Sequence, residues 1–213
     1  MALKTLEQLK VEEREARRKL IADTARELFA QKEFQEVTVR EIAKAAGVSV
    51  GTIYNHYANL GELFLDVFLE SGRQITRLMD KALEGNRPGA FRRVCRVYIN
   101  YLNDNMTFFQ MMSRFILGGG LSEEATPKLN QSMRSMMDRF ENAVRMASIQ
   151  TDTRISAHAL FSALNGIMIS YARYPGRTTE ELKQHTLRLT DTVASIFESC
   201  DHANPGPEDL SMQ

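Results

Sequence analysis

Several small, polar or aromatic side chains occur together in one short stretch and have the chemistry to bind DNA: Ser49, Val50, Gly51, Thr52, Tyr54, Asn55 and His56. Hydroxyl and imidazole groups can hold a protein on the phosphates of the DNA backbone. Arg40, which comes shortly before this stretch, adds a guanidinium that can make a bidentate contact with guanine. Together, these residue types predict a surface that enters the major groove of DNA.

Two short helices joined by a tight turn would position these side chains, and the spacing from Thr38 to Tyr57 fits that arrangement. Gly47 can adopt the positive φ that such a turn needs. Ala43 is small enough to let the helices approach, and Ile53 would pack the second helix against the first. The stretch therefore predicts a helix-turn-helix.

Capping patterns support both of these helices. Thr38 and Glu41 have the spacing of a capping box, in which a hydroxyl and a carboxylate each accept a hydrogen bond from a backbone amide at the helix start. Ser49 would cap the second helix in the same sense. Asn59 would then open a long further helix that ends near Gly85.

The composition restricts the ways in which this chain could bind nucleic acid. The chain has 213 residues, of which 43% are hydrophobic, and its 27 basic and 27 acidic residues give a formal net charge of zero. A protein that coats nucleic acid through bulk charge is therefore not expected, and DNA binding must be local. Cys95 and Cys200 lack metal-ligand spacing, and no signal peptide or membrane span is expected. We therefore expect a cytoplasmic protein with no metal, no cofactor and no membrane partner.

Apolar residues recur at helical spacing between few prolines and glycines, which predicts an all-α fold. Residues 1–58 would form an N-terminal three-helix DNA-binding domain, ordered from about residue 11. Residues 59–200 would form a larger helical domain for effector binding and dimerisation, and residues 201–213 a disordered tail. Besides the helices already named, we expect a helix from Val11 to Lys32, preceded by a frayed or extended first helix from Leu3 to Lys10, a helix from Ala90 to about Asn105 and a shorter one through Phe115. Further helices are expected from Pro127 to about Ala147, from Asp152 or Thr153 to Pro175, and from Thr178 to Ser199, the last with a capping-box pattern at Thr178 and Glu181.

The segment GVSVGTIYNHY, preceded by the VREIAKAA helix and a longer N-terminal helix, resembles the TetR family of one-component transcriptional regulators. The resemblance extends to about Leu65. It implies that hydroxyl and imidazole groups hold phosphates, namely those of Thr52, Tyr54 and His56. It implies base contacts for Val50, Gly51 and Asn55, and a base or phosphate contact for Arg40. The complete set expected at the DNA is Thr38, Arg40, Lys44, Ser49, Val50, Gly51, Thr52, Tyr54, Asn55, His56 and Tyr57.

One departure from the family pattern concerns phosphate binding. Family members usually carry a lysine just after the cap of the fourth helix, where this chain has Leu60 and Gly61. Binding would then depend on Lys44, on the basic cluster from Arg14 to Lys19, or on backbone amides at the start of the fourth helix. Because the cluster alternates with glutamates, a solvated helix face with neighbouring ion pairs is an equal alternative.

Methionine and aromatic side chains are concentrated on successive helices of the C-terminal part and could line a pocket for a small, largely apolar effector. The resemblance places the effector pocket of the family among these helices. The residues expected to line it are Phe91, Tyr98, Met111, Met112, Phe115, Met133, Met137, Phe140, Phe161, Asn165 and Met168. Such a stripe is also typical of a plain hydrophobic core, and Asn165 is either a polar anchor for a ligand or a satisfied core amide.

The last two long helices are expected to pair with their copies in a homodimer, as the resemblance and their apolar faces both imply. Small side chains would allow close approach, although they could equally serve packing within one chain: Ser156, Ala159, Ala163 and Gly166. A dimer would also hold two recognition helices about 34 Å apart, on successive major grooves.

These observations lead to the hypothesis of a ligand-responsive DNA-binding regulator, with repression as the favoured mode. Effector binding would release a repressor from its operator. Two alternatives are a non-specific architectural DNA-binding protein and a helical small-molecule carrier with a vestigial DNA head. An enzyme is not expected, because the four histidines are scattered and neither a GxSxG elbow nor a phosphate-binding glycine loop occurs.

Overall fold

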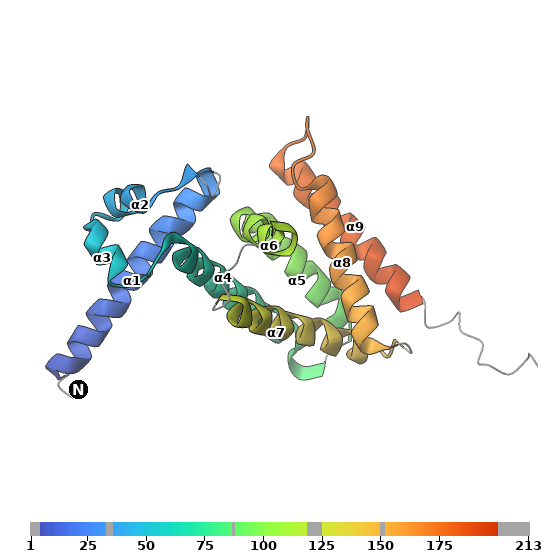
Figure 1. The fold of residues 1–213 in the computed structure, drawn as a ribbon. Helices are drawn as coiled ribbons and strands as arrows, with labels where there is room; N and C mark the ends of the chain where they lie inside the picture. Colours follow the sequence, from blue (N-terminus) through green and yellow to red (C-terminus); the bar gives the residue numbers. More distant parts are fainter. Residues whose placement is uncertain (1–4, 33–35, 87, 119–124, 150–151, 200–213) are drawn as a thin grey trace, which may run out of the picture. The chain divides into compact units, whose positions relative to one another are not determined.

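The computed structural model describes residues 5–32, 36–86, 88–118, 125–149 and 152–199 (Figure 1). The regular structure in these ranges is helical, which confirms the predicted all-α fold. In chain order the elements are α1 (Leu6–Gln31), α2 (Val39–Ala46), α3 (Val50–Tyr54), α4 (Leu60–Leu83), the 3₁₀ helix η2 (Glu84–Asn86), α5 (Ala90–Asp104), α6 (Met106–Gly118), α7 (Ala125–Met146), α8 (Thr153–Tyr171) and α9 (Thr179–Ser199). The predicted disordered tail, residues 201–213, lies outside the described residues.

The chain forms two compact units. One contains the chain up to Ser71 together with Met106–Asn130, and the other contains Gly72–Asn105 and the chain from Gln131 onward. This grouping differs from the expected division between residues 58 and 59, because the first half of α4 belongs to the same unit as the N-terminal helices.

Aromatic contacts explain why the first half of α4 joins the N-terminal unit. Phe64 of α4 meets Phe29 of α1 edge to face, with ring centroids 5.1 Å apart. One turn later, Phe68 stacks on Phe108 of α6 at 5.0 Å. These rings are buried, so the start of α4 is part of the hydrophobic core of this unit.

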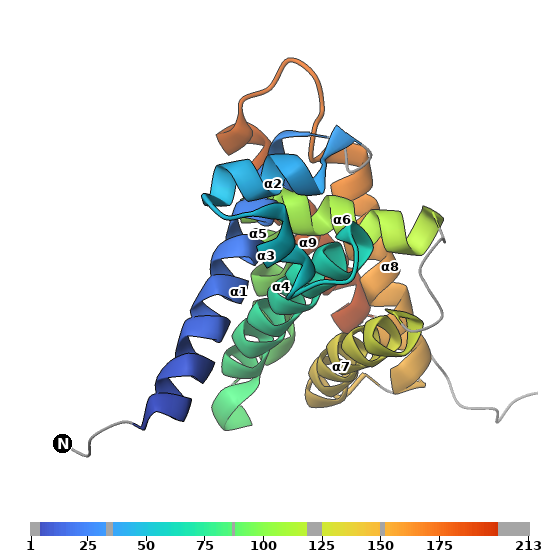
Figure 2. The ribbon, with the colours of Figure 1, turned by 60° about the vertical axis from the view of Figure 1, so that its left-hand side comes forward.

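α1 begins at Leu6, so that the segment before Val11, expected as a frayed or extended first helix, continues into the main helix. Thr5 and Gln8 form a reciprocal capping box: the Thr5 hydroxyl accepts from the Gln8 amide at 3.3 Å, and the Gln8 side chain accepts from the Thr5 amide at 2.9 Å. Residues 6–20 are exposed throughout, and in Figures 1 and 2 the first turns of α1 project beyond α2 and α3.

In the second unit, α5, α8 and α9 pack against one another, and α8 and α9 run side by side (Figures 1 and 2). Polar contacts also connect α5 to α9. The Arg92 guanidinium donates to Glu198 at 2.9 Å, and Arg96 lies 3.4 Å from the Asp191 carboxylate. Glu198 and Asp191 of α9 are therefore directed toward α5.

Two helix starts in the second half of the chain test the local predictions. At α9, Thr178 and Glu181 form the predicted capping box, since the Glu181 carboxylate accepts from the Thr178 amide at 2.8 Å and the Thr178 hydroxyl accepts from the Glu181 amide at 3.2 Å. At α7, the prediction that Pro127 is the first helical residue is wrong by two positions, because the helix begins at Ala125. Proline is tolerated there because the amides of a first helical turn have no partner within the helix.

Candidate functional site

The turn between α2 and α3 has the predicted geometry. Gly47 adopts the left-handed conformation, with φ 66° and ψ 31°. Its amide donates to the Lys44 carbonyl at 3.3 Å, and the Val48 amide donates to the Ala43 carbonyl at 3.0 Å, which closes α2. Ala43 and Ile53 are 3% and 1% exposed, and α2 and α3 pack against each other, so both side chains are buried as predicted.

Both helices are capped by a side-chain hydroxyl, but the expected capping box of α2 is incomplete. The Ser49 hydroxyl accepts from the Thr52 amide at 3.0 Å, as predicted for the start of α3. At α2, the Thr38 hydroxyl accepts from the Glu41 amide at 3.2 Å. The Glu41 carboxylate, however, pairs with Lys32 beyond the end of α1, which lowers the pKa of Glu41. The second half of the expected capping box is thus replaced by a link between α1 and α2.

The predicted DNA-binding side chains of α2 and α3 are accessible, with one exception. Tyr54 exposes 54% of its surface. Thr38, Arg40, Lys44, Ser49, Gly51 and Asn55 are also exposed, whereas Val50, Thr52 and His56 are partly buried. Because Ile53 is directed inward, the outer side of α3 remains available to a groove.

Tyr57 is the exception and corrects the sequence-based set. It is only 2% exposed, and its hydroxyl donates to the Asp66 carboxylate at 2.8 Å. The Arg18 guanidinium lies over its ring at 5.6 Å and pairs with Asp66 at 2.9 Å. Burial raises the pKa of Tyr57. Its side chain therefore fixes the segment after α3 to α1 and α4, and we assign it a positioning role in place of the expected DNA contact.

His56 lies in a cationic environment at the end of α3. Partial burial lowers its pKa below 6.5, and the nearby charges of Arg14, Arg18 and Arg17 lower it further. These arginines belong to the N-terminal half of α1, and the sequence analysis did not connect them to α3. The field at His56 favours an anion close to this end of α3.

Part of the predicted effector cluster forms an aromatic group in the second unit. The Tyr98 ring is 5.0 Å from that of Phe140 and 6.0 Å from that of Phe161, and the last two rings are 5.9 Å apart. The fully buried Tyr98 donates to the Asn165 side-chain carbonyl at 3.2 Å, and the Asn165 amide donates to the Phe161 carbonyl at 2.7 Å. Asn165 thus has the partners that a satisfied core amide requires.

The remaining members of the predicted cluster have different surroundings. Met137 and Met168 are buried in the second unit, and Met133 is half-buried. Phe91 is also buried, with its ring 6.3 Å from that of Phe197 on α9. Met111 and Met112 are buried in the first unit, and the side chain of Phe115 lies outside those described.

Metal sites and membrane spans are two further features that a helical chain could carry. Within the described ranges, no group of three or more His, Cys, Asp or Glu side chains is placed to hold a metal ion. No described helix combines the length and the apolar character that a bilayer crossing requires.

Comparison with known proteins identifies the helix-turn-helix. Residues 21–67 match the family described as bacterial regulatory proteins, tetR family. The HTH-type transcriptional regulator YhgD of Bacillus subtilis is 22% identical over 187 residues, which cover 85% of this chain and 93% of YhgD.

Solved structures share the fold over most of the chain. FadR from Bacillus subtilis, in complex with stearoyl-CoA, has a TM-score of 0.70 at 18% identity and covers 85% of this chain and 97% of its own. PfmR from Thermus thermophilus, a TetR family transcriptional regulator, has a TM-score of 0.66 at 24% identity and covers 82% and 97%. The segment that carries α2 and α3 is thus the one that matches the tetR family of bacterial regulatory proteins, and most of the chain shares its fold with these solved structures.

Proposed function

We propose that this protein is a homodimeric repressor that binds operator DNA in the cytoplasm through α2 and α3 and is released by a small, largely apolar effector. The observation that carries the proposal is the capped helix pair around Gly47, whose outer side exposes the side chains of Arg40, Tyr54 and Asn55. Exposed guanidinium, phenol and amide groups beside a buried Ile53 are suited to phosphates and base edges.

We infer that the effector would bind in the second unit, among the aromatic side chains of α5, α7 and α8. The rings of Tyr98, Phe140 and Phe161 contact one another, and so a ligand that enters between them must replace ring–ring contacts with its own apolar surface. The complex of FadR with stearoyl-CoA makes a fatty acyl compound the first candidate to test. Such a ligand would shift the equilibrium between the DNA-bound and released conformations by no more than the difference in its affinity for the two.

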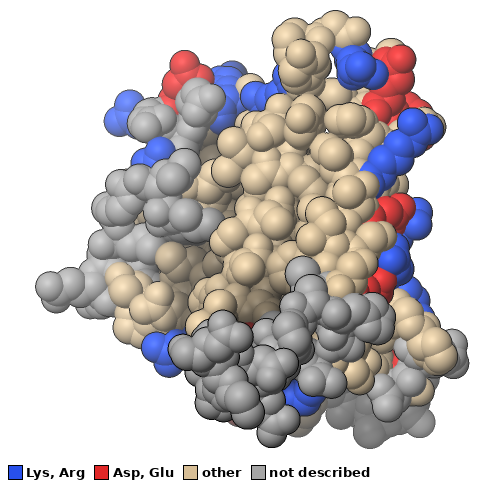
Figure 3. Space-filling view, turned by 90° about the vertical axis from the view of Figure 1, so that its right-hand side faces the viewer, with Lys and Arg blue, Asp and Glu red and all other residues tan. Residues whose placement is uncertain are grey.

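The exposed face of α8 favours a second copy of the chain as its partner. Ile155 and Ile169 of α8 are 67% and 69% exposed, and Ile196 of α9 is 56% exposed. Figure 3 shows a broad surface without Lys, Arg, Asp or Glu on the side of the molecule where α8 and α9 lie. Small residues on α8, including Ala159 and Gly166, leave this face open to close approach by another helix.

A gel-shift titration on the promoter region beside the protein's own gene tests DNA binding. We expect sequence-selective, salt-sensitive binding by the full chain, weakened when fatty acyl-CoA is added. Equal affinity for unrelated DNA would favour an architectural DNA-binding protein. Ligand binding by a chain that binds no DNA at low salt would favour a small-molecule carrier.

Sedimentation of variants at Gly166 tests the dimer. A Cβ atom built at Gly166 meets no atom within 4 Å, and so a substitution there is tolerated within one protomer. Gly166→Arg is expected to give monomers with the helical content of the wild type, whereas Gly166→Ala keeps the dimer. A Gly166→Arg variant that remains dimeric would place the interface elsewhere.

A further inference from the structure

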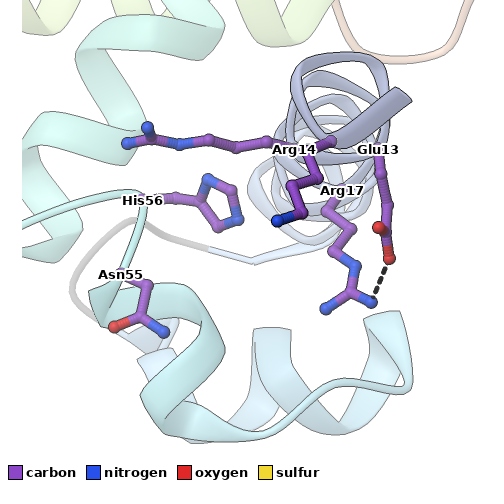
Figure 4. Close-up of a pocket in the computed structure, with 6 residues that line it drawn as sticks. Glu13, Arg14, Arg17, Asn55 and His56 are labelled. Carbon is purple, nitrogen blue, oxygen red and sulfur yellow. Dashed lines mark hydrogen bonds and ion pairs between the residues drawn. The ribbon is translucent and has the colours of Figure 1, made fainter. Parts of the chain in front are cut away.

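A hollow of about 410 Å³ lies between the N-terminal half of α1 and the end of α3. Four of its lining residues come from α1 and two directly follow α3: Lys10, Glu13, Arg14, Arg17, Asn55 and His56. Figure 4 shows Arg14 extending from α1 past His56, with Arg17 on the same side of the helix. All of these residues belong to the first compact unit.

Charge on this part of α1 is nearly balanced along the sequence but segregated around the helix. Lys10, Arg14 and Arg17 follow the spacing i, i+4, i+7 and so lie on one face. At about 100° per residue, Glu12 and Glu15 are rotated by roughly 140–200° away from Lys10. The charges that line the hollow are therefore mostly positive, although acidic and basic residues alternate in the sequence. α1 contributes three basic side chains to the hollow and a single carboxylate, that of Glu13.

The basic groups of the hollow are incompletely neutralised. Arg17 pairs with Glu13 at 2.6 Å. Neither Lys10 nor Arg14 has an ion-pair partner among the residues that the structure describes. The lowered pKa of the neighbouring His56, to which the charges of Arg14 and Arg17 contribute, is consistent with a positive potential in this space.

We propose that Lys10, Arg14 and Arg17 form a second phosphate-binding site with Asn55 and His56, and that its ligand is a backbone phosphate of the DNA that α3 engages. The inference rests on the proposed function. Asn55 and His56 line the hollow and also end the predicted DNA surface of α3, and so DNA held by α3 passes next to the α1 cations. This site would supply the phosphate anchor that Leu60 and Gly61 do not provide at the start of α4.

The salt dependence of operator binding tests this site. Lys10→Ala combined with Arg14→Ala should reduce the slope of log K against log salt by about 0.9 for each phosphate that the bound dimer no longer neutralises. Affinity should fall alike for all sequences, because a phosphate contact carries no base information. Lys81→Ala is the control, since Lys81 is a basic, exposed residue near the end of α4, belongs to the second unit and does not line the hollow; its slope should equal that of the wild type.

Glu13→Gln gives a test of opposite sign. Loss of the carboxylate releases Arg17 from its ion pair, so that DNA should bind more tightly and with a steeper salt slope than in the wild type. Circular dichroism would verify that each variant remains folded, which is expected for substitutions at exposed positions.

The outcomes separate this inference from the proposed function. Wild-type protein without sequence-selective binding would overturn the proposed function itself. Selective wild-type binding with an unchanged slope in the Lys10 and Arg14 double variant would overturn the second phosphate site alone. Calorimetric titration with inorganic phosphate tests whether the site binds a free anion and not DNA. Saturable phosphate binding that disappears in the double variant, together with an unchanged salt slope for DNA binding, would also overturn the second phosphate site.

Discussion

The helix-turn-helix and the aromatic core of the second unit contain the same side-chain types in different surroundings. Tyr54 is 54% exposed at the end of α3, whereas Tyr98 is fully buried and donates to Asn165. Asn55 is likewise exposed, while Asn165 is only 8% exposed and bonded within the core. The side-chain type alone therefore does not distinguish a binding residue from a structural one. The distinction lies in whether its polar atoms already have partners in the chain.

The largest expected difference between the two regions is in stability. Phe140→Ala removes a fully buried ring from the contacts with Tyr98 and Phe161 and should lower the free energy of unfolding by about 3–5 kcal/mol. Tyr54→Ala should change it by less than about 0.5 kcal/mol. Urea denaturation of both variants measures the difference. Similar losses would mean that Tyr54 also has a packing role.

A smaller effect is expected when only a hydroxyl is removed. Tyr98→Phe leaves the buried Asn165 side-chain carbonyl without its donor and should cost about 1–3 kcal/mol of stability. Tyr54→Phe is the control, because its exposed hydroxyl can bond to water in the unbound protein. Equal melting temperatures for the Tyr98→Phe variant and the wild type would show that Asn165 finds another partner.

Within the helix-turn-helix of α2 and α3, the effects of base contacts and of phosphate contacts should be separable. Arg40→Ala should relax discrimination between operator variants by about 1–3 kcal/mol at one base position, whereas Tyr54→Ala should weaken binding to all of them alike. Competition gel shifts with single-base operator variants measure both effects. Uniform losses for Arg40→Ala would reassign Arg40 to a phosphate.

Two glycines allow a matched comparison of backbone effects. A Cβ atom meets nothing within 4 Å at either Gly47 or Gly166, but only Gly47 has a positive φ, at 66°. Gly47→Ala should therefore destabilise the protein by about 1–2 kcal/mol, whereas Gly166→Ala should stabilise α8 by up to about 1 kcal/mol. Thermal unfolding of the two variants measures the sign of each change in stability. Destabilisation by Gly166→Ala would contradict an open face at that residue.

The smallest expected effect is a pH dependence of DNA binding. The lowered pKa of His56 leaves it neutral in the free protein at neutral pH, and a nearby phosphate would favour its protonated form. Binding would therefore take up a proton, and affinity should rise as the pH falls from about 8 to about 6.

The control for this prediction is His56→Gln, which should remove that part of the pH dependence. The other charged groups around His56 are lysine, glutamate and arginine side chains: Lys10, Glu13, Arg14, Arg17 and Arg18. A pH profile that is unchanged in His56→Gln would assign the proton to another group.

Features that depend on neighbours in sequence were predictable, as the Gly47 turn and the Ser49 cap demonstrate. The start of α1 was also within reach, because Thr5 and Gln8 have capping-box spacing. Tyr57 was misassigned because its role depends on Arg18 and Asp66, which come from other helices and show no periodic relation to it.

The hollow beside α3 and the grouping of the first half of α4 with α6 were also missed, for the same physical reason. Both depend on how separate helices pack in three dimensions. The periodicity of Lys10, Arg14 and Arg17 was readable in the sequence. The sequence did not indicate that these three residues lie close to His56.

The contacts of Tyr57 have an entropic consequence for recognition. The Asp66 carboxylate accepts from Tyr57 and pairs with Arg18, so that the segment after α3 is fixed to α1 and α4 in the unbound protein. A preorganised recognition helix loses little conformational freedom on binding, and more of its contact energy then appears as affinity. Control by an effector that melts α3 would have to break these contacts. A movement of α3 together with α1 as a rigid body would keep these contacts and would therefore cost less free energy.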